Sequence, residues 1–341
     1  VTYSETSSKF DVIMSLTRFS LKLSAVAALA VLSFSGAAHA ASGTWNGTQD
    51  AFWTNSANWS VSPFPSGGDT ATFNNAGGAA TTLDIGGLSG ILNLAFDSAS
   101  AAAYTIGTGA ANSQTNILRD SGEIKLTSTA GSSQAFNALV RLGPDATTAS
   151  YSLRNDNPAQ TLAFADIAGM SGGTKTLNLN GVGPITVNGR LDRTGSALDA
   201  SYNSSGAWTL NGDSSLRQLY INATNGVINL GAGTTMTLNN GGGSGILASQ
   251  DCTINGPGLL FMSTSGGNNH IDNGVASGKT VTINAKITGA TGFEYWQAAA
   301  YNYGSFVFTA ENDYTLSTVI NVPGTIQFAT LANRGVACNV G

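Results

Sequence analysis

The chain has 341 residues and a formal net charge of −5, and only 10% of its residues are charged, against ~25% in an average globular protein. It contains 43 glycines but only 7 prolines, and 42% of its residues are hydrophobic. This composition excludes a disordered chain, which would be rich in charge and poor in apolar residues. The 14 basic residues form no basic patch, so we expect no nucleic-acid partner.

The first forty residues have the organisation of a secretory signal peptide. Arg18 and Lys22 supply the positive n-region, the apolar stretch 23–34 follows, and Ala38-His39-Ala40 provides an A-x-A cleavage site. The alternative is a membrane anchor, but the apolar stretch is shorter than the ~20 residues that span a bilayer. We therefore predict a signal peptide over residues 1–40.

The expected start of translation is Met14, which makes residues 1–13 an upstream extension of the reading frame. Cleavage after the A-x-A site leaves Ala41 as the first mature residue. A cleavable signal peptide predicts that the mature protein is secreted or displayed at the cell surface or outer membrane.

Aromatic residues are dense in the segment that follows, residues 41–75. Trp45, Trp53 and Trp59 cluster there with Phe52. The residues that follow are predicted below to form a β-solenoid, whose first coil would expose unpaired strand edges. We therefore predict that this segment is an N-terminal cap. The functional alternative is a carbohydrate-stacking platform formed by the tryptophan faces.

Short runs in which apolar residues alternate with Thr or Asn recur through residues 76–341, the period-2 pattern of half-buried strands. No mature segment keeps the apolar periodicity of a helix over three turns. We predict an all-β fold with strands that include residues 82–85, 91–94, 123–126, 176–181, 185–189, 208–212, 227–231, 236–240, 253–256 and 281–284.

Many of these runs end in Asn or Asn-Gly, which tolerate the left-handed backbone of a tight corner. Frequent corners predict a parallel β-helix over residues 76–341, with Asn ladders where successive coils stack. The interval is 8 residues from Asn180 to Asn188 but 23 from Asn188 to Asn211, so loop length must vary. The competing fold is an antiparallel sandwich, whose loops usually carry more Pro, Asp and Lys.

Two segments resemble bacterial surface proteins with autotransporter-associated β-strand repeats. Residues 43–77 (GTWNGTQDAFWTNSANWSVSPFPSGGDTATFNNAG) match the opening of that family, from Trp45-Asn46-Gly47 through Asn58-Trp59 to the strand Asp69–Phe73. Residues 311–328 (ENDYTLSTVINVPGTIQF) are similar to its repeat, although Leu316-Ser317 stands where the family has Gly-Gly. Residues 110–300 resemble the family only in the general character of their sequence.

The resemblance implies a right-handed parallel β-helix that is exposed at the outer membrane or released. It also implies a membrane anchor or translocator barrel. The alternating strands of such a barrel are not evident before Gly341, so we expect the β-helix to be incomplete at its C-terminus and the anchor to lie outside this chain.

Motifs for chemistry are weak. Residues 169–173 satisfy the G-x-S-x-G expression, but the strand–turn–helix context of a nucleophile elbow is not predicted. The segment Gly278-Lys279-Thr280 is similar to a phosphate loop, yet no helix follows it. His270 is the only histidine after the signal peptide, and clustered Cys and His ligands are missing. We predict no catalytic residue, no metal site and no cofactor.

Polysaccharide-cleaving enzymes are the serious alternative, because β-helices host them and they use clustered carboxylates. The acidic residues are scattered, and the nearest candidates are Asp120 with Glu123, Asp192 with Asp199, and Asp251. Three carboxylates within ~5 Å in one groove would favour an enzyme.

An aromatic stretch and the two cysteines each have two possible interpretations. The aromatic stretch 293–303 (Tyr295, Trp296, Tyr301 and Tyr303) is predicted to pack in the core, with a projecting loop as the alternative. Cys252 and Cys338 either form a disulfide or stay as separate thiols.

We conclude from the sequence that the mature chain is a non-catalytic, adhesin-like surface passenger. Its expected partners are glycans or other cell surfaces, which shallow grooves of Asn, Thr and Ser would bind through hydrogen bonds. The alternative is a secreted lyase or glycoside hydrolase on the same fold.

Overall fold

The computed structural model describes residues 41–88, 90–143, 148–170, 172–192, 197–239, 244–263, 269–290, 292–296, 304–315, 317–321 and 324–330. The predicted signal peptide, residues 1–40, lies outside these ranges. Residues 40–341 form one compact unit. Apart from the single turn η1 (Ser56–Asn58), the described elements are strands, and no described helix is long and apolar enough to cross a bilayer.

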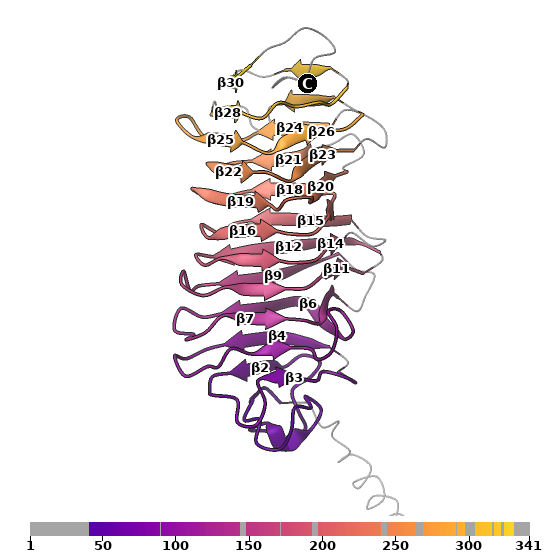
Figure 1. The fold of residues 1–341 in the computed structure, drawn as a ribbon, viewed down its shortest axis with the longest axis vertical. Helices are drawn as coiled ribbons and strands as arrows, with labels where there is room; N and C mark the ends of the chain where they lie inside the picture. The colour runs from indigo at the N-terminus through magenta and orange to yellow at the C-terminus, as the bar shows by residue number, and fades with distance from the viewer. Residues whose placement is uncertain are drawn as a thin grey trace, which may run out of the picture. The chain divides into compact units, whose positions relative to one another are not determined.

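Eleven strands form one parallel sheet in which each strand pairs with its counterpart in the neighbouring coil, from β3 at one end to β30 at the other (Figure 1). We call it the neutral sheet, because its strands contain no Asp, Glu, Lys or Arg. They are β3 (Thr82–Leu83), β5 (Thr105–Ile106), β7 (Gln134–Phe136), β10 (Leu162–Phe164), β13 (Ile185–Val187), β16 (Ala207–Leu210), β19 (Gly226–Leu230), β22 (Cys252–Asn255), β25 (Thr280–Ile283), β28 (Ser305–Phe308) and β30 (Thr325–Phe328).

The other sheet has 19 strands and contains all the charged strand residues, so we call it the charged sheet. Its strands are β1 (Gly43–Thr44), β2 (Thr70–Phe73), β4 (Ile91–Phe96), β6 (Thr115–Leu126), β8 (Leu139–Leu142), β9 (Ala149–Asn155), β11 (Ile167–Gly169), β12 (Thr174–Gly181), β14 (Leu191–Asp192), β15 (Ala197–Tyr202), β17 (Ser214–Leu216), β18 (Gln218–Ile221), β20 (Thr235–Leu238), β21 (Ser244–Ala248), β23 (Leu259–Met262), β24 (Asn269–Asn273), β26 (Lys286–Thr288), β27 (Phe293–Trp296) and β29 (Thr318–Ile320).

A typical coil passes through one strand of the neutral sheet and then two strands of the charged sheet, as β10, β11 and β12 do. The charged sheet therefore consists of two ladders, which the long strand β6 joins. Its first part, 115–118, pairs with β8, and its last part, 123–126, pairs with β9. Ser121 between them takes a left-handed φ of 68°, which turns the chain through the corner.

The core is a stack of inward-facing side chains, because alternate residues of each strand point inward and parallel register aligns them from coil to coil. Phe136 and Phe164 stack at 5.0 Å between ring centroids. In the neutral sheet the buried column runs through Leu83, Ile106, Phe136, Phe164, Val187, Leu210 and Leu230, all at most 2% exposed. Each of the ten predicted strand segments overlaps a strand, so the prediction of an all-β parallel β-helix is confirmed.

Asparagine side chains form ladders at the corners, as the sequence predicts. The amide of Asn211 donates to Asn188 at 3.1 Å, 23 residues earlier. Asn255 donates to Asn229 at 3.0 Å and Asn284 donates to Asn255 at 2.9 Å, over intervals of 26 and 29 residues. These longer intervals are full coils of variable length, whereas the short interval from Asn180 to Asn188 separates two corners of one coil.

The tryptophan cluster of residues 41–75 packs against the first coils. Trp45 and Trp53 are fully buried and Trp59 is 5% exposed. All three rings lie within 6.3 Å of the Phe73 ring, centroid to centroid. Because these indole faces are buried, the alternative of a carbohydrate-stacking platform at this cluster is wrong.

Candidate functional site

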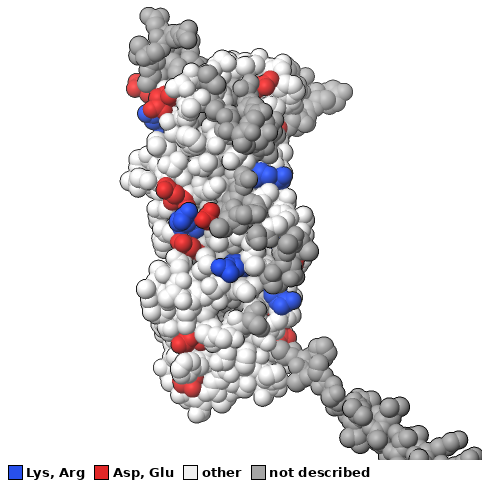
Figure 2. Space-filling view, turned by 90° about the vertical axis from the view of Figure 1, so that its right-hand side faces the viewer, with Lys and Arg blue, Asp and Glu red and all other residues white. Residues whose placement is uncertain are grey.

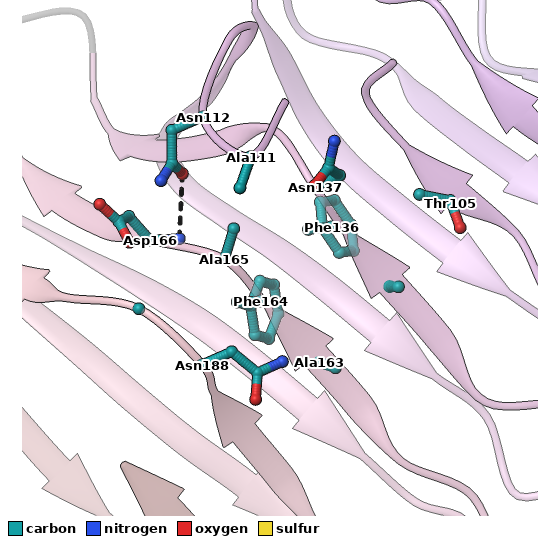
Figure 3. Close-up of a pocket in the computed structure, with 12 residues that line it drawn as sticks. Thr105, Ala111, Asn112, Phe136, Asn137, Ala163, Phe164, Ala165, Asp166 and Asn188 are labelled. Carbon is teal, nitrogen blue, oxygen red and sulfur yellow. Dashed lines mark hydrogen bonds between the residues drawn. The ribbon is translucent and has the colours of Figure 1, made fainter. Parts of the chain in front are cut away.

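A groove of about 400 Å³ opens on the outer side of the neutral sheet, near its corner with the charged sheet (Figure 3). Its floor carries the outward side chains of β5, β7 and β10, which are Thr105, Ala135 and Ala163. These three residues are paired in register across successive coils. These side chains carry only methyl and hydroxyl groups. The groove stays open because they are too small to fill it.

The loop 107–114 forms one wall of the groove and is held in place by its own hydrogen bonds. Gly107 begins it at a φ of 103°, and a Cβ there would come within 2.6 Å of the backbone nitrogen of Ala138. The side chain of Asn137 donates to Gly109 O at 2.9 Å, and Gln114 Oε1 accepts from the backbone of Thr108 at 3.0 Å. The wall is therefore preformed.

Asp166 lines the groove at the corner between β10 and β11, just beyond the C-terminal end of β10. Its backbone N–H donates to Oδ1 of Asn112, 54 residues earlier, at 3.1 Å. Its Oδ1 accepts from the backbone of Arg190 at 2.8 Å. A Cβ on Gly189 would lie 1.8 Å from that oxygen and 2.8 Å from the backbone oxygen of Ala165, so a larger residue there would displace the carboxylate. We call this feature the Asp166 groove.

A second groove of about 340 Å³ lies around the corner on the charged sheet, and Asp166 lines it too. Arg141 and Asp192 also line it. Ala168 pairs in register with Arg141 on one neighbouring strand and with Asp192 on the other, so Arg141 and Asp192 lie two coils apart in the same column. Asp192 forms an ion pair with Arg190 at 3.2 Å.

The carboxylates that the sequence singled out do not converge in one place. Asp192 lines the second groove. The other acidic residue there is Asp166, which was not among the sequence candidates. The other four each have a protein partner of their own. The hydroxyl of Tyr151 donates to Asp120, Ser152 donates to Glu123 at 3.0 Å, Arg217 forms a bidentate pair with Asp199, and Lys279 pairs with Asp251 at 3.0 Å.

The Asp199–Arg217 pair is the most buried of these. The side chain of Asp199 is 3% exposed and that of Arg217 is 33% exposed. The hydrogen bonds from Arg217 to the carboxylate raise the pKa of the guanidinium above its ordinary value. Both oxygens of the Asp199 carboxylate are therefore occupied by Arg217.

The aromatic segment 293–303 divides between core and surface. Tyr295 is fully buried, as predicted, but the prediction of core packing is wrong for Trp296, which is 39% exposed. Strand alternation explains the difference, since neighbours in β27 point to opposite sides. Trp296 stacks on His270 at 5.4 Å, and the imidazole lies 3.4 Å from Glu294 and 3.8 Å from Asp272. Tyr301 and Tyr303 lie outside the described residues.

Neither of the two weak sequence motifs is followed by a helix in the described part of the chain. Gly169 ends strand β11, and the chain enters strand β12 at Thr174, so the G-x-S-x-G segment is not followed by a helix; Ser171 itself lies outside the described residues. Lys279 is paired with Asp251, and Thr280 begins β25.

The described cysteine, Cys252, is buried and forms no disulfide within the described residues, and burial raises the pKa of its thiol to about 12. Such a thiol is unreactive at neutral pH. Cys338 lies outside the described residues, so the question of a disulfide stays open. Within the described ranges, no group of three or more His, Cys, Asp or Glu side chains is placed to hold a metal ion.

The residues that sequence reasoning missed are Asp166, Arg141 and the amides of the loop 107–114. Local sequence gives one signal for Asp166, because a single acidic residue follows a short apolar strand where a corner is expected. Nothing local links it to Asn112, since register over two coils brings them together.

The fold and the two grooves define the chain as a parallel β-helix with a preformed concave site on its side. Comparison of the chain with known protein families, with curated proteins and with solved structures gave no match.

Proposed function

We propose that this chain is an exported, non-catalytic surface protein, an adhesin-like β-helix that meets glycans or other cell surfaces through its neutral sheet. The observation that carries the proposal is that sheet. Eleven stacked strands present no charged residue, and their outward side chains are mainly Thr, Ala and Asn. Figure 2 views the molecule from the right-hand side of Figure 1, where charged-sheet strands such as β11, β14 and β23 are labelled, and it shows the Lys, Arg, Asp and Glu side chains of that face as separate patches on a mostly white surface.

A surface of this kind suits contact with uncharged, hydroxyl-rich partners. Hydroxyl and amide groups donate and accept hydrogen bonds without the desolvation cost of an ion. The buried core and the corner ladders hold successive coils in register, so the contact surface is rigid before a partner arrives.

Export is tested by producing the full chain in a Gram-negative bacterium and separating cytoplasm, periplasm, outer membrane and medium. We expect a processed protein outside the cytoplasm, with an N-terminus at Ala41. An Ala40→Arg variant should block cleavage and accumulate at precursor size, whereas Ser42→Ala should be processed normally. An unprocessed wild-type chain in the cytoplasm would contradict the proposal.

Adhesion is tested with the processed protein coupled to beads. We expect these beads to be retained on glycan-coated surfaces more than beads that carry albumin. The matched control has Thr186→Lys, Thr209→Lys and Thr253→Lys, which place charges on three strands of the neutral sheet. Equal retention of wild-type and control beads would count against the role of this sheet.

A secreted polysaccharide-degrading enzyme is the second candidate, and one observation favours it. Asp166 and Asp192 line the same groove, together with Arg141. Glycosidases use paired carboxylates as acid and base or nucleophile. Incubation with a polysaccharide panel should then release reducing ends or unsaturated products, and Asp192→Asn should abolish the release. No release by the wild type across the panel would eliminate this candidate.

A further inference from the structure

We propose that the Asp166 groove binds a short segment of an uncharged saccharide chain. This inference rests on the proposed function, since export brings the groove into contact with extracellular glycans. It goes further in naming one site, one chemical class of ligand and the residues that hold it.

The shape of the groove suits a flat, extended ligand. Thr105, Ala135 and Ala163 lie one above another on successive coils, spaced by ~4.8 Å, so the floor extends for about 10 Å along the helix axis. The volume of about 400 Å³ falls within the ~300–1,000 Å³ of small-molecule sites. The apolar floor can lie against the C–H face of a sugar ring.

Hydrogen-bonding atoms that are open to a ligand line the rim. Oδ1 of Asn188 accepts from Asn211, and Oδ1 of Asn112 accepts from the backbone of Asp166. Among the described residues, the Nδ2 amide groups of both asparagines and Oδ2 of Asp166 have no protein partner. Two donors and one strong acceptor on the rim of an apolar floor match vicinal hydroxyls, which both donate and accept.

The negative charge of the groove favours an uncharged ligand over an anionic one. Asp166 is the one charged residue among those that line this groove. The floor strands β5, β7 and β10 belong to the neutral sheet and supply no cation, while at the corner beside Asp166 the side chain of Arg190 is already paired with Asp192 and Arg141 lines the second groove. A uronic-acid or sulfated chain would bring its anion close to this carboxylate without compensation, whereas a neutral chain brings none.

The loop wall gives the site its rigidity. Asn112, which takes a left-handed φ of 64°, is tied to the coil of Asn137 by its backbone and to the coil of Asp166 by its side chain. Little conformational entropy remains to be lost at this wall when a ligand binds.

The test uses the processed full-length protein and isothermal titration with malto-, cello-, xylo- and manno-oligosaccharides, with oligogalacturonate as the acidic comparison. We expect saturable binding of at least one neutral oligosaccharide and none of oligogalacturonate. Asp166→Asn should weaken the binding about tenfold, the scale of one hydrogen bond to a charged group.

Ala163→Phe should lower the affinity more than tenfold, because the ring fills the floor. The matched control is Thr209→Phe, an outward position two coils further along the same sheet and outside the groove, which should bind as the wild type does. Thermal unfolding checks that both variants fold. Asn188→Ala is an additional groove variant at an exposed position and should weaken binding with little effect on stability.

Three results would overturn the inference: no binding of any neutral oligosaccharide, binding that Ala163→Phe and Asn188→Ala leave unchanged, or a preference for oligogalacturonate. Because these titrations use purified protein, they fail separately from the export test. A chain that is exported and adhesive but has an inert groove would overturn the groove alone.

Discussion

The neutral sheet and the charged sheet wind around the same core, yet they join neighbouring coils with different side-chain chemistry. In the neutral sheet, outward threonines, alanines and asparagines repeat from coil to coil, and amides such as Asn188 and Asn211 bond directly. In the charged sheet, charged residues occur, and several are paired with an opposite charge, as Asp199 is with Arg217. The difference shows what parallel stacking requires of a side chain that is repeated every ~4.8 Å.

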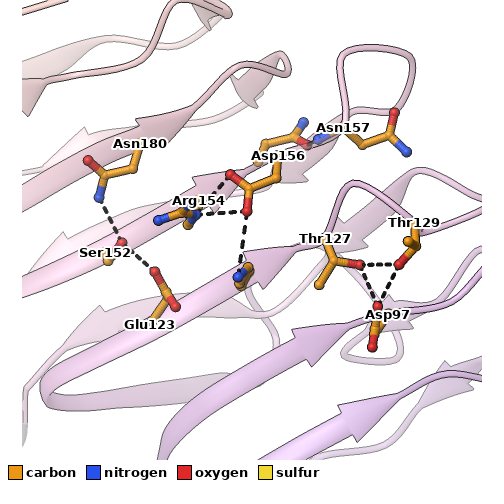
Figure 4. A network of polar contacts seen from close by, with 11 residues as sticks. Asp97, Glu123, Thr127, Thr129, Ser152, Arg154, Asp156, Asn157 and Asn180 are labelled. Carbon is orange, nitrogen blue, oxygen red and sulfur yellow. Dashed lines mark hydrogen bonds and ion pairs between the residues drawn. The ribbon is translucent and has the colours of Figure 1, made fainter.

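Amides tolerate this repetition because each one both donates and accepts, whereas identical charges repel when they stack. Lys125 and Arg154 show the difficulty, since they are paired in register on adjacent strands. Asp156 lies between them, 2.8 Å from Arg154 and 3.5 Å from Lys125 (Figure 4). These two stacked cations are therefore joined by a bridging carboxylate, whereas stacked amides bond to one another directly.

The largest expected loss of stability comes from a core residue beneath the neutral sheet. It tests whether the stability of this sheet comes from buried side chains rather than from outward ones. Trp208 is 1% exposed, and we expect Trp208→Ala to lower the free energy of unfolding by about 3–5 kcal/mol. Thr209→Ala, the adjacent outward residue, should change it by less than about 0.5 kcal/mol. Urea unfolding followed by circular dichroism measures both variants.

Trp208→Phe makes this comparison sharper. The indole Nε1 is buried without a hydrogen-bond partner, so the phenyl ring removes a polar group that costs roughly 1–3 kcal/mol to bury unpaired. We expect Trp208→Phe to lose much less stability than Trp208→Ala. Equal losses would contradict the role of the orphaned N–H.

The next effect belongs to the charged sheet. Asp199→Ala leaves the partly buried guanidinium of Arg217 without its bidentate partner, and we expect a loss of about 2 kcal/mol, because one member of the pair keeps some solvent. If the pair is the cause, adding Arg217→Met to Asp199→Ala should restore most of the stability. A double variant as unstable as the single one would point to packing instead.

These expectations also show which parts of the molecule the sequence could predict. Strand alternation and Asn corners are local signals, so the β-helix follows from segments such as 176–181 and 185–189. The same alternation could have placed Trp296 outside, next to the buried Tyr295. The Asp166 groove depends on a contact between Asn112 and Asp166 that spans two coils of unequal length, and only register supplies it.

A smaller effect is expected in the amide ladder of the charged sheet. Asn203 donates to Asn180 at 3.2 Å and accepts from Asn222 at 3.1 Å. Asn203→Ala should lower the free energy of unfolding by about 1 kcal/mol, because water replaces part of what is lost at an exposed position. Asn203→Asp should lose more at neutral pH than near pH 3, since only the ionised form lacks a donor. Thermal midpoints at both pH values measure the difference.

The smallest effect is a dependence of stability on pH at Asp97. The hydroxyls of Thr127 and Thr129 each donate to its carboxylate at 2.7 Å, and these hydrogen bonds lower the pKa of Asp97 below its ordinary value. Because the folded pKa is below the unfolded pKa of ~3.9, this group stabilises the fold above about pH 4. The contribution is lost as the pH falls through the folded pKa.

Replacing both hydroxyl donors by Thr127→Val and Thr129→Val should flatten the fall in thermal midpoint below pH 4. Thr209→Val on the neutral sheet should keep the wild-type slope, because it changes a threonine that lies in a strand without carboxylates. Since Asp97 is exposed, water competes with both hydroxyls, and the change in slope should be slight. An unchanged slope in the double valine variant would show that the acid sensitivity arises elsewhere in the molecule.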